Sequence, residues 1–111
     1  MSIFGNWKTE AIANTAAISN VIDLGNDWEK VEVVLGAMTA ADISLLITPA
    51  MQEGVTPTNS TFYNLSSTSA FNCLTGNVAY TLDSGGFRYI KVNSSVAQGA
   101  DRVIQVRGFR N

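Results

Sequence analysis

The sequence predicts an all-β protein, a single β-sandwich or jelly roll built from seven or eight short antiparallel strands. Runs rich in β-branched and aromatic residues recur about every ten residues, and turn signals such as Gly25-Asn26-Asp27 and Gly85-Gly86 separate them. A chain of 111 residues is long enough to bury one core and too short for two. We therefore expect one sandwich domain over residues 9–111, preceded by an amino-terminal arm, residues 1–8.

The clearest strand patterns lie near the carboxyl end, at 87–92 and 102–107. In both segments the residues alternate with period two, so each strand has one buried face and one exposed face. The intervening segment, 95–101, has no regular period and is too long for a tight turn. The two strands therefore form either a hairpin with a long loop or a crossover between two sheets.

The other strands follow from the same alternation, except at 9–15, which suits a helix as readily as a strand. The segment 52–60, which contains Gly54 and Pro57, is predicted to be a long loop. Further strands are expected at 18–24, 30–35, 42–48, 61–65, 71–74 and 77–82. The inward positions predict a core of Ile22, Leu24, Val31, Val33, Leu35, Ile43, Leu45, Ile47, Ile90, Val92, Ile104 and Val106.

The predicted arm carries three large apolar residues, Ile3, Phe4 and Trp7, outside any period-two segment. Gly5 and Asn6 interrupt them, as in a turn. Because interface centres gather large aromatic residues, we expect this arm to bind a partner rather than the core of its own chain. The alternative is that Trp7 folds back as a lid over the open end of the sandwich.

A second group of candidate partner-binding residues lies on the two carboxyl-terminal strands. Tyr89, Lys91, Arg107, Phe109 and Arg110 could share one outward face, and aromatic residues beside arginine suit a sugar platform or a protein interface. The alternative is an ordinary mixed strand surface.

The composition argues against several classes of partner. Charged residues make up 14% of the chain, against roughly 25% in an average soluble domain. Such a surface is compatible with extensive protein contact, because interface cores are depleted in Lys and Glu. The net charge of −2 gives no electrostatic footprint for nucleic acid or an anionic membrane, and no stretch is apolar and long enough to span a membrane. The amino terminus lacks a secretory signal pattern, so synthesis in a cytoplasm is expected.

The residues that usually carry chemistry are scarce. The chain contains no histidine, which excludes a Ser-His or Cys-His nucleophile pair, so we expect no enzymatic activity and no cofactor. The single cysteine, Cys73, lies between apolar neighbours and is expected to be a small buried hydrophobe. Oxygen ligands for calcium are available at Asp23, Asn26 and Asp27, but a solvated turn is the preferred interpretation, and no metal is expected.

Two stretches resemble small structural proteins of tailed bacteriophages. The first is 34–45 (VLGAMTAADISL); the second is GFRYIKV at 86–92, followed by SSVAQ at 94–98 and RVIQV at 102–106. They lie in the middle and at the end of the chain. The resemblance lies in strand patterns and small residues and includes no catalytic motif.

The resemblance implies a discoidin-like or jelly-roll sandwich and a role as a capsid decoration (cement) protein. Such a protein would bind the major capsid protein, form a homotrimer and bridge neighbouring subunits on the capsid surface of the virion, after synthesis in the host cytoplasm. The alternative is a glycan-binding module of a tail or head fibre. Its site would then be built from loops at one end of the sandwich, at 26–29, 52–60 and 95–101.

Overall fold

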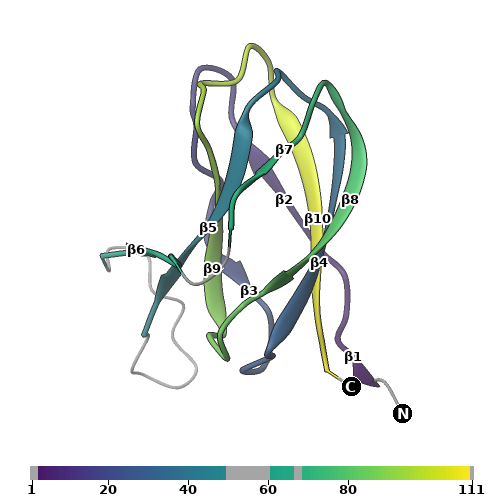
Figure 1. The fold of residues 1–111 in the computed structure, drawn as a ribbon, viewed down its shortest axis with the longest axis vertical. Helices are drawn as coiled ribbons and strands as arrows, with labels where there is room; N and C mark the ends of the chain where they lie inside the picture. The colour runs from purple at the N-terminus through teal and green to yellow at the C-terminus, as the bar shows by residue number, and fades with distance from the viewer. Residues whose placement is uncertain (1–2, 50–60, 67–68, 111) are drawn as a thin grey trace.

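The protein is a two-layered β-sandwich, which confirms the predicted fold class (Figure 1). The computed structural model describes residues 3–49, 61–66 and 69–110, and this part of the chain contains strands and no helix. Both sheets are antiparallel and have five strands each. Within the described residues, no helix is long and apolar enough to cross a membrane.

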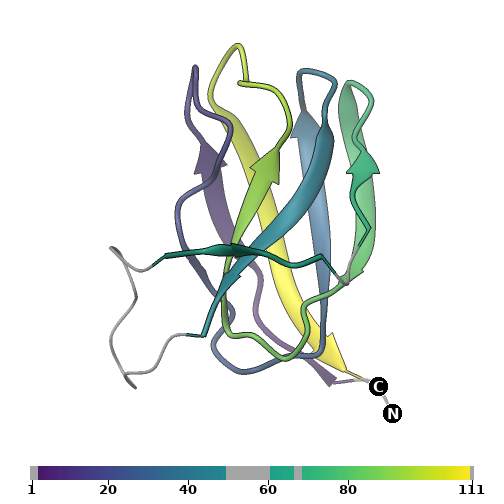
Figure 2. The same cartoon turned by 60° about the vertical axis from the view of Figure 1, so that its left-hand side comes forward.

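The first sheet, called sheet A, contains the longest strands. Its order is β1-β10-β4-β8, and β2 pairs with β10 beside β1. Figure 2 shows β2, β10, β4 and β8 side by side behind β9 and β5. The strands of sheet A are β1 (Ile3–Phe4), β2 (Lys8–Ile12), β4 (Lys30–Ala37), β8 (Gly76–Asp83) and β10 (Arg102–Arg110).

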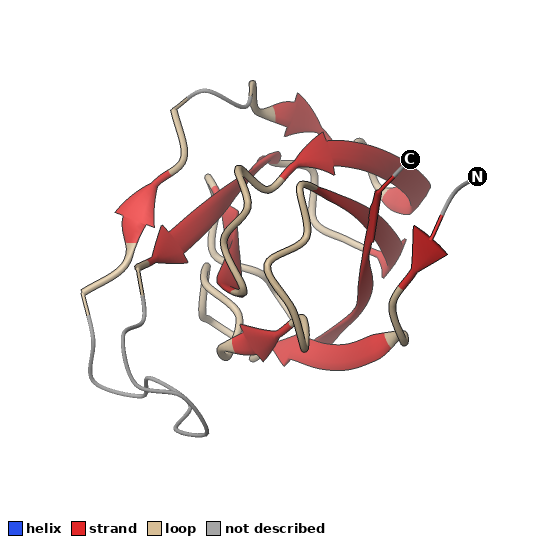
Figure 3. Ribbon diagram, turned by 90° about the horizontal axis from the view of Figure 1, so that it is seen from below, coloured by secondary structure: helices blue, strands red, loops and turns tan. Residues whose placement is uncertain are grey.

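The second sheet, called sheet B, closes the other side of the interior (Figure 3). Its order is β3-β9-β5-β6, and β7 also pairs with β5. Because β9 belongs to sheet B and β10 to sheet A, segment 95–101 is a crossover between sheets rather than a hairpin loop. The strands of sheet B are β3 (Ile22–Asp23), β5 (Asp42–Thr48), β6 (Tyr63–Asn64), β7 (Phe71–Asn72) and β9 (Tyr89–Ser94).

The core lies between the two sheets and contains every residue predicted for it. On β4, for example, Val31 and Val33 are fully buried, while the intervening Glu32 points to the outer face. Cys73 is also fully buried, as predicted. The alternation did not reveal several further core residues: Ile12, Trp28, Met38, Ala41, Leu82 and Tyr89.

The predicted strand at 18–24 is mostly irregular in the structure. Only Ile22 and Asp23 form a strand, and Ile18, at the start of the predicted strand, is 45% exposed. The buried hydroxyl of Ser19 accepts a hydrogen bond from the Val92 amide at 2.9 Å. The Ser19 amide also donates to the Val92 carbonyl at 3.0 Å, so a side chain and the backbone share the pairing with β9 here, which period-two reasoning cannot anticipate.

The segment 3–8, set apart above as an arm, pairs with the carboxyl-terminal strand of sheet A. Phe4 lies opposite Phe109, and the Gly5 amide donates a hydrogen bond to the Gly108 carbonyl at 2.8 Å. The backbone of this segment therefore extends the sheet. Its large side chains nevertheless remain outside the core, since Trp7 is 45% exposed.

Candidate partner-binding site on the outer face of sheet A

Four side chains from the two ends of the sequence meet on the outer face of sheet A. We call Phe4, Trp7, Arg107 and Phe109 the aromatic–arginine cluster. The Arg107 guanidinium carbon lies 4.2 Å from the centroid of the Phe4 ring and 4.6 Å from that of the Trp7 ring. The Phe4 and Phe109 rings stack with centroids 5.6 Å apart. The cluster is thus a cation–π arrangement with aromatic groups around one arginine.

Strand register brings the cluster together. Phe4 and Phe109 are directly opposite in the β1–β10 pairing, and Arg107 lies two positions along β10 on the same face. Across the sheet, Arg107 lies opposite Glu32 of β4, and its Nε donates a hydrogen bond to Glu32 Oε1 at 2.6 Å. This charge-assisted bond holds the guanidinium in place between the rings.

The aromatic rings of the cluster are only half covered by their own chain. Phe4 is 48% exposed and Trp7 is 45% exposed, although both already contact Arg107. Aromatic and arginine side chains of this kind supply much of the binding energy at protein interfaces. The cluster therefore has the composition and exposure of an interface centre.

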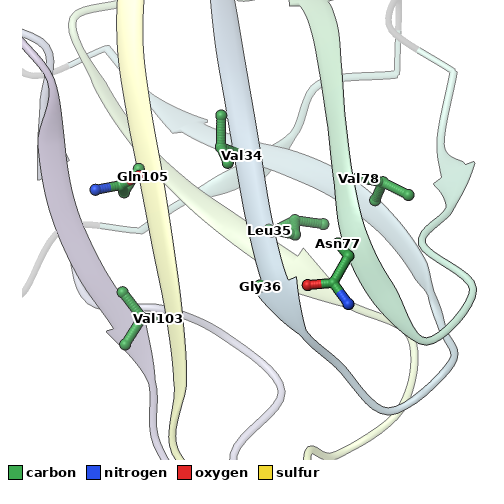
Figure 4. A pocket seen from close by; sticks show the side chains of 7 residues that line it. All are labelled: Val34, Leu35, Gly36, Asn77, Val78, Val103 and Gln105. Atoms are coloured by element: carbon green, nitrogen blue, oxygen red, sulfur yellow. The ribbon is translucent and has the colours of Figure 1, made fainter.

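A shallow hollow lies farther along the same face of sheet A (Figure 4). We call it the Gly36 hollow; its volume is about 420 Å³. Gly36 forms its floor: a β-carbon added there would meet no atom within 4 Å. Val103, which is 57% exposed, stands beside it. The residues lining the hollow are Val34, Leu35, Gly36, Asn77, Val78, Val103 and Gln105.

The prediction of a single outward face for the two carboxyl-terminal strands is wrong. Tyr89 is only 5% exposed and belongs to sheet B, so it cannot join a surface on sheet A. Lys91, also on β9, places its ammonium 4.5 Å from the Phe62 ring centroid. Arg110 lies over the Trp28 ring, at 5.7 Å. The physical reason is the crossover, which sends consecutive strands to opposite layers of the sandwich.

Asp23, the first of the three candidate calcium ligands, is engaged by an arginine. Arg88 Nε and Nη2 donate to its two carboxylate oxygens at 2.7 and 3.1 Å, and the Gly25 amide donates to Oδ1 at 2.8 Å. The Arg88 hydrogen bond lowers the pKa of Asp23, against a smaller opposing effect of partial burial, and the Gly25 amide lowers it further. The described residues contain no group of three or more Cys, Asp or Glu side chains placed to hold a metal ion.

A second, more polar hollow lies between the edge strands β2 and β3, and we call it the β2–β3 hollow. Its volume is about 360 Å³. It combines an exposed indole with charged side chains from both sheets. The residues lining it are Trp7, Lys8, Thr9, Glu10, Val21, Ile22 and Asp23.

Two of the three loops predicted to form a glycan site do not come together. Segments 26–29 and 95–101 lie at opposite ends of the sandwich (Figure 1). At one end the Ser84 amide donates a hydrogen bond to the Glu29 carbonyl. At the other end the Thr39 amide donates a hydrogen bond to Gln98 Oε1. The third loop, predicted at 52–60, lies outside the described residues.

The fold and the site define an all-β sandwich domain with an exposed aromatic–arginine cluster. No family model matches the sequence, and no curated protein matches it significantly. Among solved structures, it is similar to the SPBc2 prophage-derived protein YomS, with a TM-score of 0.52 and 14% identity over 97% of this chain and 96% of that one. It is also similar to the Yersinia pseudotuberculosis-derived mitogen, with a TM-score of 0.51 and 8% identity over 97% and 87% of the two chains. At sequence identities this low, the similarity of the structures shows a shared fold alone.

Proposed function

We propose that this protein is a non-enzymatic structural protein of a phage particle, a capsid decoration protein that binds the major capsid protein and bridges neighbouring subunits. The observation that carries the proposal is the half-exposed aromatic–arginine cluster on sheet A. The fold shared with a prophage-derived protein and the sequence resemblance to phage structural proteins support the phage context.

The cluster suits a protein partner because its parts are already ordered. Phe4 and Trp7 would supply apolar area, with losses of about 2 kcal/mol or more expected when a hot-spot side chain is truncated. Arg107 is paired with Glu32 and covered by rings, so a partner would remove little further water from it. Less rotamer freedom is then lost on binding than with a free arginine.

The Gly36 hollow would extend the same interface. It lies on the outer face that carries the cluster, and its floor has room for an incoming apolar side chain. Cluster and hollow together span much of β10, which is compatible with a standard interface of about 1,600 Å² in total. Many copies around a capsid would add avidity.

Co-sedimentation with phage particles that lack this protein tests the proposal. Wild type should pellet with the particles, and Trp7→Ala should lose most of that binding while its thermal melt changes little. The matched control is Ile18→Ala, because Ile18 is also 45% exposed but lies away from sheet A. This control should bind like wild type.

Two results would contradict this function. Binding by Trp7→Ala equal to that of wild type would remove the cluster from the interface. Failure of wild type to pellet, or a copy number per virion far below that of the major capsid protein on a stained gel, would rule out decoration.

A glycan-binding module of a tail or head fibre is the second candidate, and the β2–β3 hollow is the observation that favours it. Carbohydrate sites combine an aromatic platform with carboxylates and cations, as Trp7, Glu10 and Lys8 do here. A glycan array probed with wild type and Glu10→Gln tests this candidate. Selective binding that Glu10→Gln abolishes would favour it over decoration.

A further inference from the structure

Strand β8 leaves one long side of sheet A open. It pairs with β4 from Gly76 to Asp83, and within the described part of the chain no other strand pairs with it. In Figure 2 it forms the right-hand margin of the sheet. An outer strand presents a row of amide and carbonyl groups that can pair with another strand.

Between Val78 and Leu82, β8 carries none of the charges or prolines that usually protect such an edge; Gly76 and Asn77, at the start of the strand, have left-handed backbone with φ of 96° and 55°. Residues 76–82 (GNVAYTL) include no charged residue and no proline; Asp83 is the only charge, at the strand end. The other outer strands differ: β1, β3, β6 and β7 have two residues each, and β2 carries Lys8 and Glu10. Among the described strands, β8 is therefore the one edge that is both long and uncharged.

The side chains of β8 leave room for a neighbouring strand. Asn77, Ala79 and Thr81 point to the outer face and are exposed. On the other face Tyr80 stacks on Phe71 of β7, with ring centroids 3.7 Å apart. Since β7 pairs with β5, this contact covers the inner face of β8 and not its edge.

We propose that β8 pairs antiparallel with β8 of a second copy of this chain, which joins the two copies of sheet A into one continuous sheet. A two-fold axis perpendicular to the sheet reverses the strand direction, so two identical edges meet antiparallel. Centred on Ala79, the pairing sets Val78 opposite Tyr80 on the inner face, whereas Asn77, with a φ of 55°, ends the regular ladder. A β-branched residue opposite an aromatic one is a favourable cross-strand pair.

Charge favours a second copy as the occupant. A strand without charges offers no electrostatic signal to a charged partner, whereas self-pairing of 76–82 brings no like charges together. Asp83 falls beyond the paired residues. The axis also leaves both outer faces on the same side, so both aromatic–arginine clusters point in one direction.

This inference is independent of the proposed function. The molecular mass of the protein in solution tests it. In analytical ultracentrifugation, wild type should sediment as a dimer when its concentration is raised towards the millimolar range, and it should form no larger species. Ala79→Lys, which sets two ammonium groups opposite each other at the axis, should be monomeric, and its thermal melt should equal that of wild type diluted until it is monomeric. The matched control is Val103→Lys, an equally new charge at an exposed position of the same face but on the interior strand β10, and it should remain dimeric.

A cysteine variant tests the same pairing without relying on a destabilising charge. In Ala79→Cys the two thiols would lie within disulfide range across the axis, so mild oxidation should give a covalent dimer on a non-reducing gel. Val103→Cys should not cross-link, and the native Cys73 is fully buried and will not interfere. A monomeric wild type, the mass of a trimer, a dimer that survives Ala79→Lys, or no cross-link through Cys at position 79 would each overturn the proposal.

Discussion

Gly108 of β10 lies directly against the indole of Trp28, and only a hydrogen atom fits between them. A β-carbon added at Gly108 would lie 2.6 Å from the Trp28 β-carbon and closer still to the ring. Trp28 is buried, and its Nε1 donates a hydrogen bond to the Leu24 carbonyl at 3.0 Å. The glycine thus allows a large side chain to close the core beneath β10.

Gly108→Ala should therefore destabilise the fold. The added methyl group must displace a buried, hydrogen-bonded ring, and overpacking of this kind costs about 1–3 kcal/mol. Urea denaturation measures the loss. Gly36→Ala is the control: its β-carbon enters open space, so its unfolding midpoint should equal or exceed that of wild type. Equal stability of Gly108→Ala and wild type would contradict the packing described here.

Ile90→Ala and Val106→Ala should each lower the free energy of unfolding by roughly 2 to 4 kcal/mol, because each removes buried methyl groups from the centre of the core. Both side chains are fully buried. Val103→Ala provides the comparison, since Val103 is on β10 as well but is 57% exposed, and its loss should be slight. A circular dichroism spectrum dominated by helix would refute the fold itself.

The Asp23–Arg88 ion pair should make a small contribution to stability that depends on pH. The pKa of Asp23 is lowered in the folded state, so the contribution is present above the ordinary value of 3.8 and is lost as the pH falls through the lower folded value. Because both side chains are about one-third exposed, the effect at neutral pH should stay below about 1 kcal/mol.

Asp23→Asn tests this contribution. The variant should be slightly less stable than wild type at neutral pH, and the difference should shrink as the pH falls below 3.8. Added salt should also reduce the difference. A gap between the two proteins that widens in acid would show that the carboxylate does not stabilise the fold.

Gln98 joins the crossover loop to the loop that follows β4. It is 1% exposed; its Oε1 accepts from the Thr39 amide at 2.8 Å, and its Nε2 donates to Ser94 Oγ at 2.9 Å. Gln98→Ala removes the acceptor of the Thr39 amide, at a cost of about 1–3 kcal/mol, whereas Ser94 Oγ keeps its hydrogen bond to the Val96 carbonyl. Hydrogen exchange of the Thr39 amide should speed up more than that of strand amides. Uniform acceleration along the chain would instead indicate only global destabilisation.

The candidate site was partly predictable from sequence. Phe4, Trp7, Arg107 and Phe109 were all among the expected partner-binding residues, because large aromatic residues and arginine were read as interface formers. The alternation along 30–35 sets Glu32 on the outward face of its strand. Its partner, Arg107, is 75 positions away in the sequence, so the alternation could not identify it. The Gly36 hollow was missed, since the glycine was interpreted as the end of a strand that in fact continues to Ala37.

Local alternation, together with the turn signals between strands, determined the all-β class and the part of the core that lies on regular strands. It placed residues such as Val33 and Ile90 inward because side chains alternate along any strand, whichever strand lies beside it. Tertiary structure decided which strands became neighbours. Burial of Tyr89 depends on the assignment of β9 to sheet B, and the meeting of Phe4 with Arg107 depends on the pairing of β1 with β10. Long-range packing sets that assignment, because period two marks the buried face of a strand and carries no information about its partner.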